Sequence, residues 1–120
     1  MNEMTEEDAL ALVEDGLVSE RSLPVKLRMC EGLDHAMLER TKEALKFLAR
    51  LYRERDTVPK RLARATVDLT SLLMSSERYY SEDLWYEVLK AGEDLTSLAY
   101  SIFEPAPHDT SDPRSGEQRE

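Results

Sequence analysis

The sequence predicts an all-α fold, a small bundle of four to five helices, and three observations carry that prediction. Chain breakers are scarce, with 4 Gly and 5 Pro in 120 residues, and three of the prolines fall in the last sixteen positions. Apolar residues recur every three to four positions through most of the chain. Residues that begin helices stand just before these runs. We therefore expect one helical domain over residues 1–104 and a disordered acidic tail over 105–120, which has almost nothing to bury.

The first predicted helix begins at Thr5 and ends near Gly16. The Thr5 hydroxyl is suited to cap free backbone N–H groups, and the acidic residues that follow favour the positive end of the helix dipole. Leucine and valine then recur at helical spacing. Gly16 is interpreted as the residue that stops this helix.

A second helical region follows, and Gly32 is its weak point. Pro24 suits the first turn of a short helix that runs through Cys30. Glycine inside a helix costs about 1 kcal/mol relative to alanine, so a break is expected near Gly32, with Asp34 capping a new start. Cys30 lies among apolar neighbours, and we expect it to be a small buried side chain.

The long helix predicted over 34–54 is expected to be central to the bundle, because its apolar face is broad. Leu38, Leu45 and Tyr52 repeat every seven residues along it.

Two further helices are predicted, over 59–75 and 81–103. Val58 precedes a proline and so avoids helical geometry, whereas Pro59 suits a first helical turn. Ser81 is a good cap for the last helix, whose apolar residues form a wide surface that includes Trp85.

Composition excludes several classes of protein. No apolar run approaches the roughly 18 residues that cross a bilayer, so no membrane association is expected. The single cysteine favours a reducing, cytoplasmic location. His35 is the one histidine in the predicted folded region, too few ligands for a metal site and too few partners for a catalytic triad. We therefore predict a protein that is not an enzyme and that uses no cofactor.

Charge is distributed in blocks along the chain, whose net charge is −9. Residues 1–20 carry seven acids and no base, residues 40–64 carry nine bases and three acids, and residues 65–104 carry eight acids and two bases. The basic segment has two interpretations: it neutralises neighbouring acidic helices, or it forms a patch for nucleic acid or an acidic partner. The residues of this predicted basic patch are Arg50, Arg53, Arg55, Lys60, Arg61 and Arg64.

The stretch "YYSEDLWY" at 79–86 holds four of the eight aromatic residues of the chain. Helical periodicity places Trp85 in the core. The tyrosines either cover the end of the bundle, with the hydroxyl in water, or form a recognition patch, since Tyr is enriched in binding hot spots. That predicted aromatic patch comprises Tyr79, Tyr80, Tyr86 and Tyr100.

The wide apolar faces also predict an oligomer, most simply a homodimer or a complex with another helical protein. Gly92 permits close approach of a second helix, so the expected seam is Val88, Gly92, Leu95 and Ala99.

Three functions remain open at this stage. The first is a small cytoplasmic adaptor, regulator or subunit that acts through protein–protein contacts. The second is an acidic inhibitor or immunity-type protein that neutralises a basic partner. The third is a nucleic-acid-associated regulator that uses the basic residues of 50–64.

Overall fold

The fold is all-α, as the sequence predicts. The computed structural model describes residues 3–67, 69 and 80–105, and within them it shows helices and no strand. The described helices are α1 (Glu6–Leu17), α2 (Leu23–Arg28), α3 (His35–Leu51), α4 (Lys60–Thr66) and α6 (Glu82–Phe103). The tail predicted over 105–120 lies outside the described residues from 106 onward.

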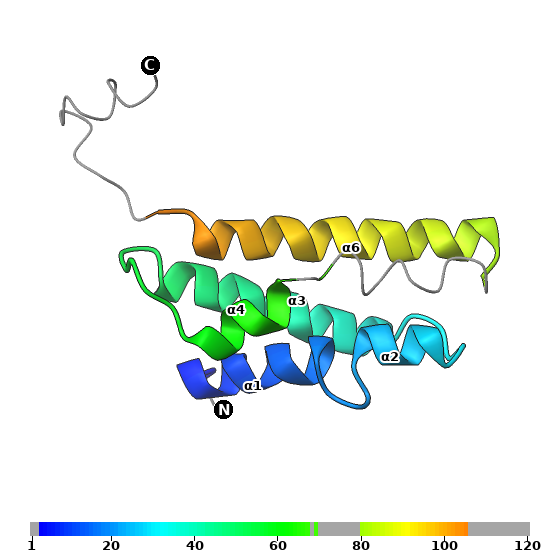
Figure 1. Ribbon diagram of the computed structural model, residues 1–120, viewed down its shortest axis with the longest axis horizontal. Coiled ribbons are helices and arrows are strands. Elements are labelled where there is room, and N and C mark those ends of the chain that lie inside the picture. Colours follow the sequence, from blue (N-terminus) through cyan, green and yellow to red (C-terminus); the bar gives the residue numbers. More distant parts are fainter. Residues whose placement is uncertain (1–2, 68, 70–79, 106–120) are drawn as a thin grey trace, which may run out of the picture.

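Helix α3 is the centre of the arrangement, with α1 on one side and α6 on the other (Figure 1). Helix α4 packs on α1, and the short α2 continues the α1 layer beyond its end. Contacts between α3 and α6 advance in the same direction along both helices, from the pair His35–Glu87 to the pair Lys42–Asp94, so these two helices are parallel.

The caps predicted at Thr5, Asp34 and Ser81 are confirmed, whereas Pro59, expected in the first turn of its helix, is the extended residue just before α4. At α1 the Thr5 hydroxyl accepts a hydrogen bond from the Asp8 backbone N–H at 3.1 Å, and the Asp8 carboxylate accepts one from the Thr5 N–H. This reciprocal capping box satisfies two backbone donors that the helix leaves free. At α3 and α6 the cap is one-sided: the side chain of Asp34 accepts from the Met37 N–H, and that of Ser81 accepts from the Leu84 N–H.

One hydrophobic core cluster draws on all five described helices. The predicted row Leu38, Leu45 and Tyr52 is buried, and so is Trp85. The tyrosine ring at the end of that row lies where α3 faces the start of α1, because its hydroxyl donates a hydrogen bond to Glu6.

The break predicted near Gly32 is confirmed, but Cys30 is not buried. Helix α2 ends at Arg28, and both Cys30 (φ +61°) and Gly32 (φ +86°) adopt left-handed backbone geometry before α3 begins. The chain reverses there, so the Cys30 side chain leaves the helical face and is exposed to solvent. The prediction failed because it assumed that the helix continues through the cysteine.

Some helices are described over a shorter range than the sequence predicts. Helix α3 ends at Leu51 rather than at 54, since Tyr52 leaves helical geometry (φ −93°, ψ 7°). Helix α4 is described from Lys60 to Thr66, and the remainder of the helix predicted over 59–75 lies largely outside the described residues. None of the described helices combines the length and the apolar character that a bilayer crossing requires.

Gly16 does not stop α1. It is buried inside the helix, one residue before its end, where α1 crosses α3. A Cβ atom at this position would overlap Thr41 Oγ1 and lie only 3.2 Å from Thr41 Cβ. The glycine therefore sets how closely α1 approaches α3.

Candidate functional site

The residues of the predicted aromatic patch have different roles in the fold. Tyr80 is half-buried, and its ring stacks on that of Trp85 with the centroids 6.1 Å apart. Its hydroxyl donates to the Leu27 carbonyl at 2.8 Å and accepts from the Gly32 N–H at 3.2 Å. Tyr80 thus fastens the turn between α2 and α3, which is a packing role.

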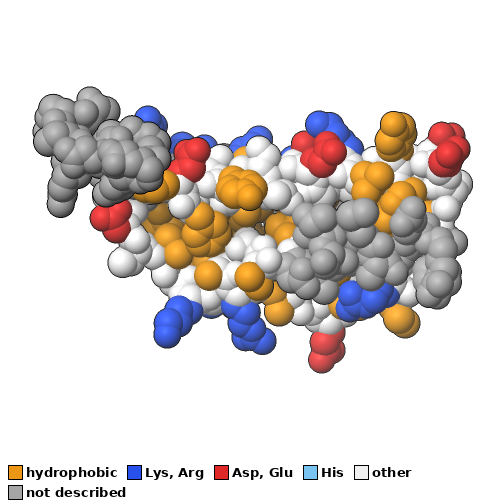
Figure 2. All heavy atoms as spheres, turned by 45° about the horizontal axis from the view of Figure 1, so that its top comes forward, with side chains coloured by type: hydrophobic (Ala, Val, Ile, Leu, Met, Phe, Trp, Pro, Cys, Tyr) orange, Lys and Arg blue, Asp and Glu red, His pale blue; other side chains and the backbone are white. Residues whose placement is uncertain are grey.

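Tyr86 and Tyr100 face solvent on α6, with exposures of 75% and 72%. They lie on the side of α6 opposite the buried residues, and at 1.5 Å per residue they are separated by about 21 Å along the axis. Figure 2 shows the molecule turned toward this side: charged groups alternate with hydrophobic side chains along the upper edge, and a continuous hydrophobic area lies below them in the left half of the view. We call the exposed side of α6 that carries these two tyrosines the outer face. Tyr79 lies outside the described residues.

A small recess lies at the Tyr86 end of the outer face. It is lined by Tyr86 and Leu89 together with Glu87, Lys90 and Glu93. An exposed ring beside a half-buried leucine gives an apolar centre, and the two glutamates outnumber the lysine around it.

The seam predicted for a dimer is buried inside the chain. Val88 and Leu95 have no exposed surface, Ala99 is 8% exposed, and Gly92 is also buried. A second copy therefore cannot reach these residues in this fold. The sequence pattern identified them correctly as apolar contact residues, but it could not tell contact within the chain from contact between chains.

Arg61 of the predicted basic patch is bound to α1. Its guanidinium donates to both carboxylate oxygens of Glu7, at 3.0 and 3.1 Å, and to Glu14 at 2.6 Å. The hydrogen bond from Arg61 is the main reason that the pKa of Glu14 lies below its ordinary value, although burial acts in the opposite direction. The pKa of Arg61 is raised, chiefly by its hydrogen bond to Glu14. This arginine neutralises an acidic helix.

A second contact joins the same two regions at the start of α1. Burial raises the pKa of Tyr52, and the 2.6 Å hydrogen bond that its hydroxyl donates to Glu6 adds to the effect. Arg55 lies 4.0 Å from the same carboxylate and 5.4 Å from the centre of the Tyr52 ring. Glu6 is thus held between a phenol and a guanidinium.

The other four bases of the patch are exposed. Arg50, Arg53 and Lys60 lie around the turn between α3 and α4, whereas Arg64 lies further along α4, beside Leu17 and Pro24. Arg64 contributes to the lowered pKa of Glu14 through its charge. Two acids, Glu54 and Asp56, lie in the same turn. Arg55 and Arg61 are therefore paired with acids of α1. The negative charge of α1 also weakens the positive potential around the remaining bases.

An ion pair and a histidine–glutamate contact also join α3 to α6. Lys42 lies 3.4 Å from Asp94, and His35 Nε2 lies 3.6 Å from Glu87. Burial acts to raise the pKa of Asp94, but hydrogen bonds from Lys90 and Lys42 outweigh it and lower the pKa. Lys42, Lys90 and Asp94 are charged residues at the edge of the contact between α3 and α6. Among the described residues, no three His, Cys, Asp or Glu side chains come together in a way that would hold a metal ion.

Replacing Arg61 with glutamine should destabilise the protein at neutral pH, and the difference from wild type should shrink in acid. The folded pKa of Glu14 is depressed, so the stability it contributes is present above its ordinary value of 4.5 and is lost as pH falls through the lower folded pKa. Urea unfolding midpoints at neutral pH and at steps below pH 4.5 measure this gap.

The matched control is Lys46→Gln, which removes one cation from an exposed pair with Glu43. Exposed pairs contribute little, so this variant should track the wild type at every pH. A gap between Arg61→Gln and wild type that stays constant through the acid range would contradict the assignment of Arg61 to Glu14.

No family model, curated protein or solved structure matches this chain. Functional inference therefore rests on the surfaces described above.

Proposed function

We propose that the protein is a small non-catalytic adaptor or subunit that binds another protein through the outer face of α6. The observation that supports this most directly is the exposure of Tyr86 and Tyr100, at 75% and 72%, on the side of the helix that packs against nothing else in the described chain. Tyrosine is enriched at binding hot spots because it brings a large apolar ring and a hydroxyl at low conformational cost.

The charge of the outer face indicates what the partner must offer. Glu87 and Glu93 lie beside Tyr86, with Lys90 between them. A partner with apolar recesses for the two phenol rings and positive groups around them would complement this surface. The partner is proposed to be a different protein, because the residues expected to join two copies are buried and the net charge of −9 opposes self-association. We expect the isolated protein to have the mass of one chain, 13.8 kDa, by light scattering.

A cytoplasmic location belongs to the same proposal. Cys30, the single cysteine of the chain, is exposed and free, which suits a reducing compartment. The nucleic-acid alternative is weakened, because Arg55 and Arg61 are engaged by acids of α1. The alternative of an acidic inhibitor keeps support from a different surface, on α1.

The double variant Tyr86→Ala, Tyr100→Ala should lose its partner while keeping its fold. Both rings are exposed, so we expect little change in the free energy of unfolding, and about a tenfold or greater loss of partner captured from host-cell extract. Quantitative mass spectrometry of the material captured by each variant measures this loss.

The matched control is Met29→Ala, Val67→Ala, which truncates two side chains of 65% and 82% exposure on other elements. It should capture the same proteins as wild type. If the tyrosine variant captures the same set as this control, the outer face of α6 is not the binding surface.

A further inference from the structure

The acidic residues of the α1 region point to two different sides. Glu7 and Glu14 turn toward α4, where Arg61 binds both of them. Glu3, Asp8 and Asp15 lie on another side, along a shallow groove of about 740 Å³. The first set is neutralised within the fold, and the second gives the groove a negative rim.

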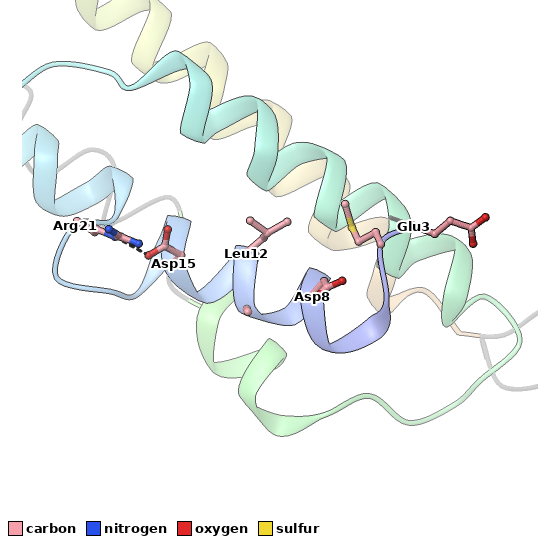
Figure 3. Close-up of a pocket in the computed structure, with 7 residues that line it drawn as sticks. Glu3, Asp8, Leu12, Asp15 and Arg21 are labelled. Carbon is pink, nitrogen blue, oxygen red and sulfur yellow. Dashed lines mark hydrogen bonds and ion pairs between the residues drawn. The ribbon is translucent and has the colours of Figure 1, made fainter. Parts of the chain in front are cut away.

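The groove also has an apolar lining. Met4, Ala11 and Leu12 contribute it, and Met4 and Leu12 pack partly on the hydrophobic core beneath. Figure 3 shows Asp8, Leu12 and Asp15 in a row along α1, with Arg21 reaching Asp15 from the turn that follows the helix. Methionine adapts its shape to varied apolar partners, and this property suits a docking surface.

Arg21 is the one cation among the described residues that line the groove, and its side chain is loosely held. It donates a hydrogen bond to Asp15 at 3.0 Å, but its side chain is 75% exposed. An exposed pair of this kind contributes little, so an incoming cation can exchange with Arg21 at small cost. The Asp8 carboxylate accepts a hydrogen bond from the Thr5 N–H, and a carboxylate retains capacity to accept further hydrogen bonds.

We propose that this groove binds a basic amphipathic helical segment of another protein. The apolar side of such a helix would lie on Met4, Ala11 and Leu12, and its lysines or arginines would face Glu3, Asp8 and Asp15. Three acids against one base make the rim negative, which selects a cationic segment over an acidic one. The site lies on α1, away from the outer face of α6, so it does not depend on the function proposed above.

The probe is a fluorescein-labelled synthetic helix of about 18 residues, with leucines along one side and lysines on the other. Its binding to the full chain is followed by fluorescence anisotropy. Ala11 is exposed and lines the groove, so it accepts substitution without disturbing the core. Ala11→Lys places a cation and a longer side chain in the groove and should weaken binding about tenfold, whereas Ala11→Glu should strengthen it.

Two controls separate docking from general attraction to an acidic protein. Ala36→Lys makes the same charge change at an exposed position of α3 outside the groove and should leave the affinity within about twofold. A lysine–serine helix of equal charge should bind at least about tenfold more weakly, since it lacks the apolar side. Equal weakening by Ala11→Lys and Ala36→Lys, equal affinity for the two peptides, or no binding of the lysine–leucine peptide would each overturn the proposal. None of these outcomes involves Tyr86 or Tyr100, so they leave the function proposed for α6 standing.

Discussion

Gly16→Ala should destabilise the protein by about 1–3 kcal/mol, the range for an extra methyl group forced into a close-packed contact. Helix propensity alone would favour alanine at this position by up to about 1 kcal/mol, so the direction of the change is diagnostic. The new methyl group would overlap Thr41 Oγ1 and crowd Thr41 Cβ and Cγ2. Thr41 cannot turn away easily, because it is 1% exposed and its hydroxyl donates to the Met37 carbonyl at 2.8 Å. Urea unfolding measures the loss.

A double-mutant cycle gives the control. Thr41→Ala removes Oγ1, the atom that the new methyl group would overlap, and also Cγ2, while Cβ stays at 3.2 Å. Its own cost is that of a small cavity. The double variant Gly16→Ala, Thr41→Ala should therefore be more stable than the sum of the two single effects predicts, by about 1 kcal/mol or more. Additive effects, or an alanine at position 16 that stabilises the protein, would show that α1 and α3 are not in close contact here.

The role of Gly16 could not be predicted from the sequence. A glycine near the end of a helical run is typical of a helix terminus, and the sequence alone contains nothing to separate that role from a helix crossing. The distinction depends on Thr41, twenty-five positions further along the chain, and on the packing of two helices. By contrast, the caps at Thr5, Asp34 and Ser81 were predictable, because a cap acts on backbone groups two or three residues away.

The placement of Tyr86 could be predicted from the sequence, but that of Tyr80 could not. Tyr86 lies inside a regular helix, where helical periodicity is enough to separate it from the buried side that holds Trp85. Tyr80 precedes the helix, where no period applies, and its role depends on Leu27 and Gly32, some fifty residues earlier. The residues next to Tyr80 in the sequence therefore do not indicate that its hydroxyl bonds to the turn between α2 and α3.

For the charged residues, too, the sequence shows the general pattern but not the individual contacts. Blocks of opposite charge left two interpretations open for the segment 40–64, neutralisation of neighbouring acidic helices or a patch for an anionic partner. In the structure Arg61 and Arg55 contact acids of α1. Which base meets which acid could not be predicted, because the answer depends on how α4 lies across α1. The acidic groove beside Asp8 and Asp15 was missed for the same reason, although the excess of acids over residues 1–20 was a signal that acids would outnumber bases on one side of α1.

Leu95→Ala should produce the largest loss of stability, about 2–5 kcal/mol, because it removes a leucine side chain that has no exposed surface and leaves a cavity. Leu95 was predicted to join two copies of the chain, whereas the structure buries it inside one copy. The two arrangements differ in a measurable way. A residue packed within the chain gives a loss that is independent of protein concentration, and a residue at a dimer seam gives unfolding midpoints that rise with concentration.

Tyr100→Ala is the matched variant on the same helix. It lies five positions further along, is 72% exposed, and should change the free energy of unfolding by less than about 0.5 kcal/mol. Urea unfolding of both variants over a hundredfold range of protein concentration, with light scattering on the same samples, makes the comparison. Midpoints that shift with concentration in the wild type and lose that shift in Leu95→Ala would place Leu95 between chains. Constant midpoints with a large loss for Leu95 and almost none for Tyr100 would place the first in the core and leave the second free to meet a partner.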